Sequence, residues 1–453
     1  MTVSSDAKNV RQLAAEILHK VESQKAYADL LLDHHLRTAG LIEADRALLT
    51  ELTYGTLRWR ARIDSKLAPF LNRSLAETDP FNRNLLRITL YQLLFLDKIP
   101  AYAAVNEAVE IAKIIQPKSA GFINGVLRNF LRQLEKQGKG REVKSSTSNL
   151  AEEYSYPQWL VDRWLGYFGP EPAKALMLAS NQRAPLVVRV NQRLTTRAEL
   201  LDRWQESGIG AEPSLISPQA IRLPAGVSIE ALFGFAEGHF QVQSEPSQLV
   251  SHLVGPVAGE TILDACAAPG GKASHFAELI GDRGKVIAID TSARGIARIA
   301  QNAERLRLTS VQAIRADASK ALLGDLAGPY DRILVDAPCS GLGTLRAHPE
   351  IKWQRNDSDI ARLAALQARI LRSAAACLIG GGVLVYSTCT LTADENEQVI
   401  ESFLRQHSQF ELTEAARYLP ESARHMVRDK YFQALPQRDD TDGFFAARMR
   451  KVA

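Results

Sequence analysis

The sequence predicts a multidomain chain: an all-α N-terminal bundle, a small α+β middle unit, and a C-terminal α/β domain with a doubly wound sheet. Three observations support this order. The chain has 453 residues, too many for one ordinary hydrophobic core. Apolar residues before position 135 recur at helical spacing, whereas short apolar strands alternate with helices from about residue 257. A basic, polar stretch at 136–151 is predicted to be a linker that follows the helical part of the chain.

The N-terminal domain, predicted to span 1–140, is expected to contain only helices. Its first helix is indicated by one apolar stripe, made by Val10, Leu13, Ala14, Ile17, Leu18 and Val21. Further helices are expected at 44–60, 82–96, 103–115 and 120–134. The helix at 82–96 is too apolar for a surface helix, so it is placed at the centre of the bundle. Pro100 and Pro117 separate the later helices.

The middle unit is predicted to span 150–245 and to mix helices with strands. A helical stretch rich in aromatic residues is expected at 157–178, and a second helix at 196–207. Strands are expected at 186–190, 220–223 and 239–242. These short elements indicate a small α+β unit.

The C-terminal domain, predicted to span 246–453, alternates strands with helices. Strands are expected at 261–265, 285–290, 311–315, 330–336 and 382–387, and helices at 272–280, 293–306, 360–377 and 394–407. Repeated β-α units imply a parallel sheet with helices on both faces. Ligands of such sheets bind at the carboxyl ends of the strands, so the informative residues are those that follow each strand.

Composition excludes several classes of protein. No apolar run approaches the roughly 20 residues that span a bilayer, and residues 1–8 lack the apolar core of a signal peptide, which favours a cytoplasmic protein. The four cysteines form no CxxC pair, which argues against a zinc site, any other metal site or a disulfide framework. A net charge of +4 permits a nucleic-acid partner. The densest basic segment, Lys118–Lys144, fits RNA binding and a solvated helix face equally well.

A cofactor loop is predicted after the first strand of the C-terminal domain, in Asp264-Ala-Cys-Ala-Ala-Pro-Gly-Gly-Lys272. Small residues and two glycines let the backbone approach a ligand, and the loop leads into a helix N-terminus. The spacing matches neither the phosphate loop nor the dinucleotide GxGxxG pattern. A nucleoside ligand without a pyrophosphate fits better.

Two carboxylates follow the next strands and suit the rest of such a ligand. Asp290 can accept both ribose hydroxyls, and Asp317 can accept from an adenine amino group. Any one of these acids alone could be a helix N-cap. Because these two acids and the Gly-Gly loop lie at the ends of three successive strands, they together favour an adenosyl group lying across the sheet edge.

Two cysteines follow the last two strands, in Asp336-Ala-Pro-Cys339 and in Ser387-Thr-Cys389. A lone cysteine in a sheet is usually a small core residue. Two cysteines at neighbouring strand ends, each flanked by hydroxyls, suggest chemistry on a pyrimidine. C5 of cytosine becomes nucleophilic only after a thiolate adds to C6, and Asp336 could act near N3, protonated or sharing its proton. Since a free thiol has a pKa of about 8.5, the attacking cysteine needs activation, for which a helix N-terminus is suited.

The segments DACAAPGGK, DAPCSGLGTLRAHPEIKW, YSTCTLTADENE and DGFFAARMRK resemble the NOL/NOP/Sun family of RNA 5-methylcytosine methyltransferases. The N-terminal segments DRALLTELTYGTLRW and FINGVLRNFLR resemble the NusB-type RNA-binding domain, a combination typical of the bacterial RsmB (Fmu/Sun) branch. The resemblance implies a Rossmann-like class I fold, S-adenosylmethionine as cofactor, and a cytosine of 16S, small-subunit ribosomal RNA as substrate.

The resemblance also separates the two cysteines, which their positions leave equivalent. It implies that Cys389 is the nucleophile and that Cys339 assists release of the product. The implied cofactor contacts are Cys266, Ala267, Ala268, Pro269, Gly270, Gly271, Lys272, Asp290, Asp317 and Asp336. Lys272 could cap the cofactor loop or be a surface lysine. The sequence departs from many relatives at Ser244, where they carry aspartate, so that loop is given no role.

Contacts with RNA are open at this stage. Candidates after the PCSG motif are Arg346, His348, Lys352 and Trp353, which could also form an ordinary polar loop. Candidates in the N-terminal domain are Arg58, Arg60, Arg62, Arg128 and Arg132. The competing functions are a transfer-RNA cytosine methyltransferase and a non-catalytic RNA-binding assembly factor. A 5-methyluridine enzyme would need only one nucleophilic cysteine. The protein is expected to act as a monomer.

Overall fold

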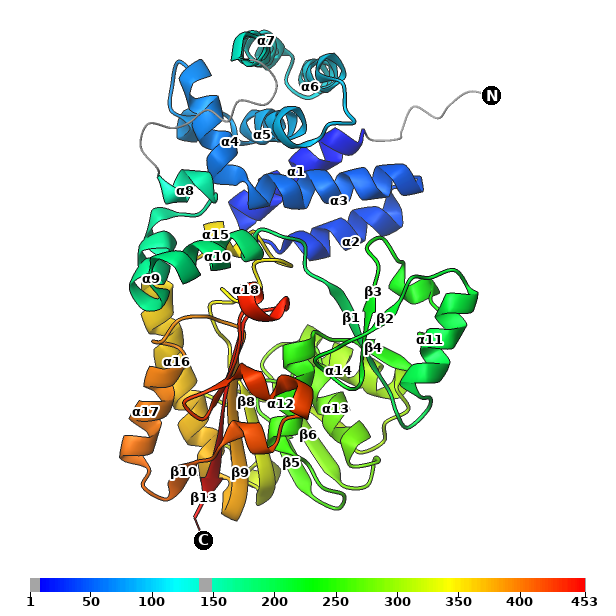
Figure 1. The fold of residues 1–453 in the computed structure, drawn as a ribbon, viewed down its shortest axis with the longest axis vertical. Helices are drawn as coiled ribbons and strands as arrows, with labels where there is room; N and C mark the ends of the chain where they lie inside the picture. The colour runs from blue at the N-terminus through cyan, green and yellow to red at the C-terminus, as the bar shows by residue number, and fades with distance from the viewer. Residues whose placement is uncertain (1–8, 138–148, 453) are drawn as a thin grey trace. The chain divides into compact units, whose positions relative to one another are not determined.

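The computed structural model describes residues 9–137 and 149–452, and the chain divides into two compact units (Figure 1). The first unit is formed by residues 1–181 together with 347–355, and the second by 182–346 together with 356–453. The predicted boundaries of three domains stay a prediction, because the two compact units are divided at other residues. Most of the predicted linker, residues 138–148, lies outside the described residues.

The first unit contains a helical bundle in which the predicted helices are confirmed. Its helices are α1 (Val10–Gln24), α2 (Ala28–Thr38), α3 (Glu43–Arg58), α4 (Arg60–Leu67), α5 (Pro80–Phe95), α6 (Ala101–Ile115) and α7 (Ala120–Gln137), with 3-10 turns at Ala68–Phe70, Leu75–Glu77 and Pro117–Ser119. Helix α5 is buried along most of its length, as its apolar sequence predicted. Asp79 caps it by accepting hydrogen bonds from the backbone amides of Phe81 and Asn82. Helix α2 was not anticipated.

The first unit continues with α8 (Leu150–Glu153), α9 (Gln158–Phe168), α10 (Pro170–Ser180) and the distant short helix α15 (Ile351–Gln354). The Lys352 side chain is fully buried, and its ammonium donates to the carbonyl oxygens of Arg58 and Ser155, both at 3.0 Å, and to Asn181 Oδ1 at 2.7 Å. The Trp353 indole N–H donates to the Leu57 carbonyl at 2.7 Å. These bonds explain why residues 347–355 belong to the first unit.

The second unit begins with a small antiparallel sheet in the strand order β2-β3-β1-β4. Its elements are β1 (Leu186–Val190), α11 (Arg197–Glu206), β2 (Glu212–Pro213), β3 (Ala220–Leu223), the 3-10 turn Ile229–Ala231 and β4 (Phe240–Val242). Trp204 of α11 packs its ring against Phe240, and both are fully buried. The α+β character predicted for this region is confirmed.

A larger sheet follows, with the strand order β11-β12-β13-β9-β8-β5-β6-β7 and β10 beside β13. Its strands are β5 (Thr261–Asp264), β6 (Lys285–Asp290), β7 (Val311–Arg315), β8 (Tyr330–Asp336), β9 (Leu378–Thr388), β10 (Phe410–Leu412), β11 (Val427–Arg428), β12 (Tyr431–Ala434) and β13 (Phe444–Lys451). The first five strands are parallel, as predicted. The predicted strands did not include β13, which runs antiparallel to β9 and pairs six of its residues with it.

Helices cover both faces of this sheet (Figure 1). The covering helices are α12 (Glu245–Val254), α13 (Gly271–Leu279), α14 (Ala293–Arg305), α16 (Asp357–Ala376) and α17 (Glu397–Gln406). The unit also contains the short helix α18 (Pro436–Asp439) and 3-10 turns at Gly324–Leu326, Ala415–Arg417 and Glu421–Met426. Alternate residues of each strand enter opposite cores. Leu334 of β8 packs with α12, α13 and α14, whereas Ile333 and Val335 pack with α16 and α17.

No helix within residues 9–137 and 149–452 is long and apolar enough to cross a membrane.

Replacing Lys352 with methionine tests the anchor of residues 347–355. The change keeps the apolar stem but leaves three buried oxygen acceptors without their donor, so the free energy of unfolding should fall by about 2 kcal/mol. Urea unfolding followed by circular dichroism measures the shift. Lys98→Met, at an exposed position of the same unit, is the matched control. Equal midpoints for the two variants would show that the buried ammonium contributes nothing to stability.

Candidate active site

The candidate site lies at the carboxyl ends of the parallel strands. Strand β5 pairs with β6 on one side and with β8 on the other. Strand order reverses there, and this is the place where ligands bind in open α/β sheets. Asp264, Asp290 and Asp336 end β5, β6 and β8. The loops that carry Cys339 and Cys389 follow β8 and β9.

The loop after β5 is held in place by Asp290. The Ala268 amide donates to Asp290 Oδ2 at 3.1 Å, and the Ser292 amide donates to Oδ1 at 2.9 Å. Gly270 has a φ of 99°, a left-handed conformation that glycine adopts readily, and α13 begins at the next residue. Each oxygen of Asp290 keeps acceptor capacity for a ligand, because a carboxylate has about four lone-pair sites.

Asp317 lies after β7 and is also shaped by local hydrogen bonds. Its Oδ1 accepts from the Ser319 hydroxyl at 2.6 Å and from the Ser319 amide at 3.0 Å. These bonds lower the pKa of Asp317. Its side chain is 38% exposed, so the carboxylate can receive a donor from a ligand.

Two groups deeper in the site, Asp264 and Cys266, have raised pKa values. Burial, and then the negative charge of Asp336, raise the pKa of Asp264 to about 7. Burial and the charge of Asp264 raise the pKa of the Cys266 thiol. Cys266 is therefore a neutral thiol in the wall of the site, not a nucleophile. Asp264 was assigned no role of its own from the sequence, because the residues around an acid that ends a strand do not show how deeply it is buried.

Lys272 and Asp336 form an ion pair inside the site. The Lys272 ammonium lies 2.6 Å from Asp336 Oδ2, and the Ser387 hydroxyl donates to Asp336 Oδ1 at 2.7 Å. Lys272 is only 8% exposed, so its interpretation as a surface lysine was wrong. The ammonium also lies 5.2 Å from the ring centroid of Phe444. The pair joins the cofactor loop to the strand that precedes Cys339.

The two predicted cysteines meet. Their sulfur atoms lie 3.4 Å apart, and both are free thiols. The hydrogen bond to Cys389, burial and the charge of Cys389 raise the pKa of Cys339 well above its usual range. Gly343 lets the Cys339 loop approach the Cys389 loop, because a Cβ at position 343 would lie 2.9 Å from the carbonyl oxygen of Cys389.

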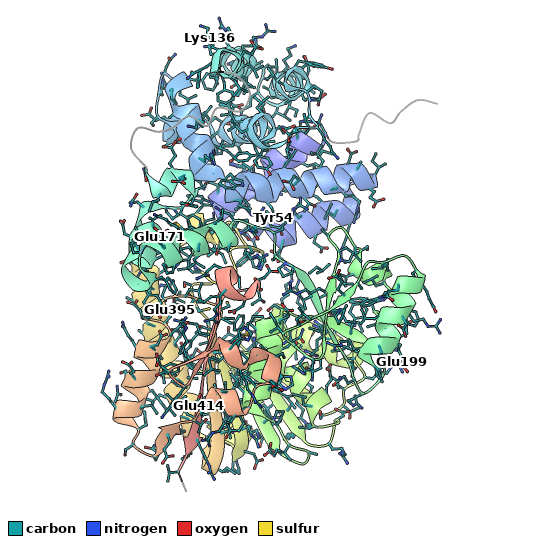
Figure 2. The ribbon with its side chains drawn as sticks, viewed as in Figure 1. Tyr54, Lys136, Glu171, Glu199, Glu395 and Glu414 are labelled. Carbon is teal, nitrogen blue, oxygen red and sulfur yellow. The ribbon has the colours of Figure 1, made fainter. Side chains whose placement is uncertain are left out.

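Glu395, labelled in Figure 2, joins the loops that carry the cysteines. Its carboxylate is fully buried and accepts from the amide and the hydroxyl of Ser340, at 2.8 and 2.5 Å. The other donors are the Gln367 amide at 3.0 Å and the hydroxyls of Thr392 and Thr390 at 2.9 and 3.3 Å. The sequence did not single out Glu395, although it lies in the Asp394-Glu-Asn-Glu run, where a buried acid looks like a solvated one.

Two of the candidate RNA contacts after the PCSG motif were wrong, because their donors are used inside the protein. Arg346 is 5% exposed and donates to the Arg183 carbonyl and to Asp440. Lys352 has the three buried acceptors described above. Trp353 lies beside it, half-buried, in the first unit.

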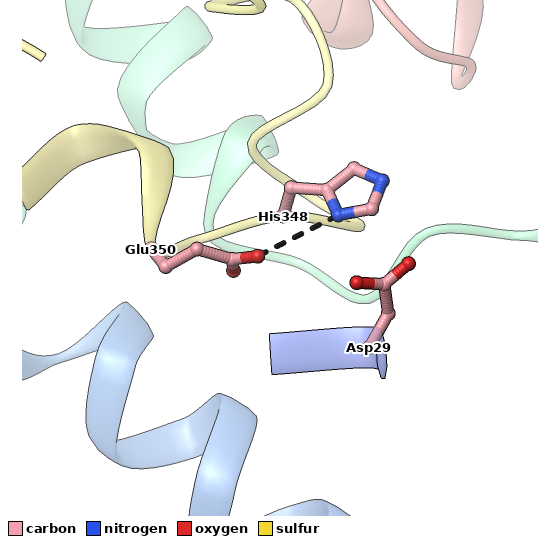
Figure 3. Close-up of side chains that lie close together, drawn as sticks. All are labelled: Asp29, His348 and Glu350. Atoms are coloured by element: carbon pink, nitrogen blue, oxygen red, sulfur yellow. Dashed lines mark ion pairs between the residues drawn. The ribbon is translucent and has the colours of Figure 1, made fainter. Parts of the chain in front are cut away.

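His348, the remaining candidate of that loop, lies beside Glu350 and Asp29 in the first unit (Figure 3). Its Nδ1 is 3.7 Å from Glu350 Oε1, which also accepts from the Ala28 amide at 3.1 Å. Among the residues that the structure describes, these three form the one group with ligand atoms close enough, within 4.8 Å, to hold a metal ion. The absence of a metal in the protein stays an expectation.

The N-terminal candidates divide by exposure. Arg58 is 7% exposed, and Arg60 forms an ion pair with Glu22 at 3.0 Å. Arg62 is half-buried, with its guanidinium over the Trp59 ring. The exposed candidates are Arg128 and Arg132 of α7.

The donor set of the site fits S-adenosylmethionine. An adenosyl cofactor offers ribose hydroxyls, amino groups and a positive charge, all of which need acceptors or anions. The site supplies carboxylates at successive strand ends, in Asp264, Asp290 and Asp317, and a loop of small residues that leaves room beside them. Gly295 confirms how close this packing is, since a Cβ there would lie 2.8 Å from the Ala268 methyl.

Comparison with known proteins identifies the family. Family models match in three places: 16S rRNA methyltransferase RsmB/F at 251–450, NusB at 8–132, and the ferredoxin-like domain of RsmF/B-like methyltransferases at 156–230. The probable ribosomal RNA small subunit methyltransferase B of Bacillus subtilis is 42% identical over 98% of this chain and 99% of its own length. The ribosomal RNA small subunit methyltransferase B of Serratia proteamaculans is 36% identical over the same shares.

Solved structures agree. The crystal structure of PH0851 has a TM-score of 0.84 at 26% identity and covers 98% of this chain and 99% of its own. NSun6 from Pyrococcus horikoshii, solved with the S-adenosylmethionine analogue SFG, has a TM-score of 0.59 at 25% identity over 66% of this chain and 99% of its own. Sequence and structure together show that the chain belongs to the RsmB/F methyltransferase family and uses S-adenosylmethionine as its cofactor.

Proposed function

We propose that the protein transfers a methyl group from S-adenosylmethionine to C5 of a specific cytosine in 16S ribosomal RNA, through a covalent bond between Cys389 and C6 of the base. The observation that carries the proposal is the pair of sulfur atoms 3.4 Å apart, on loops that follow β8 and β9. The ion pair of Lys272 with Asp336 lies at the same edge of the sheet, where β8 ends. Ordinary methyl transfer to an amine or hydroxyl would need no thiol.

The proposed reaction assigns one task to each side chain. The Cys389 thiolate adds to C6, which forms the S–C6 bond and moves an electron pair to C5. Asp336 and Lys272 act on the N3 side of the ring, where hydrogen bonds stabilise the charge that the addition creates. The bound cofactor supplies the methyl group. C5 then gives up its proton to a base while the S–C6 bond breaks, which restores the ring and returns the thiolate.

The two cysteines differ in a way that supports their separate roles. Cys339 holds its proton strongly, because the hydrogen bond to Cys389 and burial raise its pKa. A neutral Cys339 can donate its S–H to the Cys389 sulfur 3.4 Å away. Cys389 is then the attacking group, and Cys339 is the group beside it when the adduct breaks down.

The RNA substrate is supported by the named relatives and by the NusB match at 8–132. The proposal takes the protein to act as a monomer in the cytoplasm, on free 16S RNA or an early assembly form of it. Transfer of a methyl group from tritiated cofactor, with ribosomal RNA from cells lacking the protein, tests the substrate. The label should map to 5-methylcytosine in 16S RNA. Label in uracil or in transfer RNA, or none in any RNA, would contradict the proposal.

The roles of the cysteines are tested by exchanging each for alanine. Cys389→Ala should abolish methyl transfer and form no covalent complex, because the S–C6 bond cannot form. Cys339→Ala should accumulate a complex with RNA that survives denaturation, because release is impaired. Gel electrophoresis under denaturing conditions separates the two outcomes. The opposite pattern would exchange the two assignments, and Cys377→Ala, at a cysteine outside the site, is the control.

Glu395 is expected to act as a positioning residue. Glu395→Gln keeps the volume but turns one acceptor oxygen into a donor that faces the donors of Ser340 and Gln367. The rate constant for methyl transfer should fall by about 100-fold, the order expected when a reacting group is displaced by 1 Å. Affinity for the cofactor, measured by calorimetry, should stay within about twofold, since Glu395 touches no residue of the cofactor loop. The exposed Glu401→Gln on α17 is the control. A parallel loss of cofactor binding would indicate general misfolding.

Asp264 should make cofactor affinity depend on pH. Its pKa of about 7 means that it is mostly protonated at pH 6 and mostly ionised at pH 8. An ionised Asp264 attracts a positively charged cofactor, so affinity for S-adenosylmethionine should rise by about fivefold across this range if binding lowers the pKa by about one unit. Calorimetry measures it, and Asp264→Asn should flatten the profile. S-adenosylhomocysteine, which lacks the sulfonium charge, should show a weaker rise. An unchanged profile in Asp264→Asn would assign the dependence to another group.

A further inference from the structure

Arg189 is a fully buried arginine of β1, in the small antiparallel sheet. Successive residues of a strand point to opposite faces, and Val188 and Val190 enter the apolar core around Trp204. Arg189 lies between them and points to the other face, where its guanidinium meets α13. An arginine is almost never fully buried unless its charge and its donors have partners, so the partners of this one indicate its task.

The guanidinium bonds to one face of α13 along most of the helix. Nη1 donates to the Gly271 carbonyl at 2.7 Å, and Nη2 donates to the Ser274 hydroxyl at 3.1 Å. The Glu278 carboxylate accepts from Nε at 3.0 Å and from Nη2 at 2.6 Å. Positions three and four residues apart lie on the same face of a helix. Contacts at 271, 274 and 278 therefore oppose both sliding of α13 along its axis and rotation about it.

The remaining donor of Arg189 returns to the small sheet. Nη1 also donates to Gln243 Oε1, and the Gln243 amide donates to the Val187 carbonyl of β1 at 3.1 Å. All five N–H donors of the guanidinium are then used, which fixes its orientation. The Glu278 side chain is 6% exposed, and burial raises its pKa, whereas the Arg189 charge lowers it. Each member of the pair is thus needed to keep the other charged.

Helix α13 begins where the cofactor loop ends, so the position of the helix sets the position of the loop. Gly271 and Lys272 are its first two residues. A slip of α13 by one residue would move Lys272 by about 1.5 Å and break its 2.6 Å contact with Asp336. The loop has a second tie, because Asn302 of α14 donates to the Pro269 carbonyl at 3.0 Å.

We propose that Arg189 is a positioning residue for the cofactor, because it holds α13 and the loop before it in the arrangement that binds S-adenosylmethionine. A loop that is already in its bound arrangement loses less freedom when the ligand arrives, so affinity is higher. The small sheet thereby contributes to cofactor binding through one side chain. The inference deepens the proposed function, and its activity readout rests on that function, but its binding readout does not.

Two changes of Arg189 test the role by calorimetry of S-adenosylmethionine binding to the full chain. Arg189→Lys keeps a cation beside Glu278, but an ammonium cannot reproduce the planar fork that reaches Gly271 as well. Arg189→Met combined with Glu278→Met removes both charges and fills their space with apolar groups, which buried ion pairs often tolerate without loss of stability. Both variants should bind the cofactor about tenfold more weakly, as expected if the loop is in its binding arrangement about a tenth of the time.

Arg305→Met is the matched control. Arg305 joins the same small sheet to α14, where its Nη1 donates to the carbonyls of Phe235 and Phe240, both at 2.9 Å. Within residues 9–137 and 149–452 no hydrogen bond links Arg305 to α13 or to the cofactor loop. The control loses the same charge and loosens the same sheet, yet its affinity for the cofactor should stay within about twofold of that of the unaltered protein.

Two outcomes would overturn the assignment. Full affinity in the double methionine variant would show that Arg189 serves only to neutralise Glu278. A loss in Arg305→Met as large as that in the Arg189 variants would show that any loosening of the small sheet weakens cofactor binding. Urea unfolding reports whether each variant is folded. If the double variant does not fold, unaltered affinity in Arg189→Lys alone contradicts the role.

Methyl transfer to 16S RNA separates this inference from the proposed function. With Arg189→Lys, KM for S-adenosylmethionine should rise about tenfold, while kcat at saturating cofactor stays within about twofold, because the bound cofactor itself holds the loop. If the unaltered protein methylates no cytosine but its cofactor affinity still depends on Arg189, the proposed function fails alone. If it methylates cytosine and Arg189→Lys binds the cofactor with full affinity, the positioning role fails alone.

Discussion

The carboxylate of Glu395 sets the distance between the two cysteines. A buried carboxylate is costly unless donors surround it, and Glu395 collects them from the loops after β8 and β9 and from α16. Because Ser340 follows Cys339 and Thr390 follows Cys389, each loop is tied to the same carboxylate by the residue next to its cysteine. The sulfur atoms can meet only while both loops are held. The hydrogen bonds of one buried carboxylate thereby join the ends of two strands into one site.

A second set of charges fixes the cofactor side of that site. Lys272 is the cation among the acids Asp264, Asp290 and Asp336, and it lies in the first turn of α13, where the helix dipole disfavours a positive charge. Its ion pair with Asp336 offsets that cost. Burial is the main cause of the raised pKa of Asp264, about 7, and the negative charge of Asp336 adds to it. The placement of one lysine thus divides the acids into paired and unpaired groups.

Local pattern was enough to predict the parallel strands, most helices and the positions of Cys339 and Cys389, because each depends on residues close in sequence. What it missed depends on distant partners. Lys352 looked like an RNA contact in a polar loop, yet its acceptors at Arg58, Ser155 and Asn181 come from far earlier in the chain. Strand β13 was missed for the same reason, since it is defined by pairing with β9. The roles of the two cysteines came from family resemblance, and only the raised pKa of Cys339 adds a physical distinction.

The segment 347–355 gives the chain an unusual order of assembly. It follows the loop of Cys339 in sequence, but its side chains complete the core of the first unit, where Trp353 packs with α1, α3 and α5. During synthesis from the N-terminus the helical bundle is therefore made early but closed late, after the first four parallel strands have already been translated. No single cut of the gene would release either unit whole. An exchange of domains between relatives would therefore have to carry this short segment with the helices, not with the sheet that flanks it.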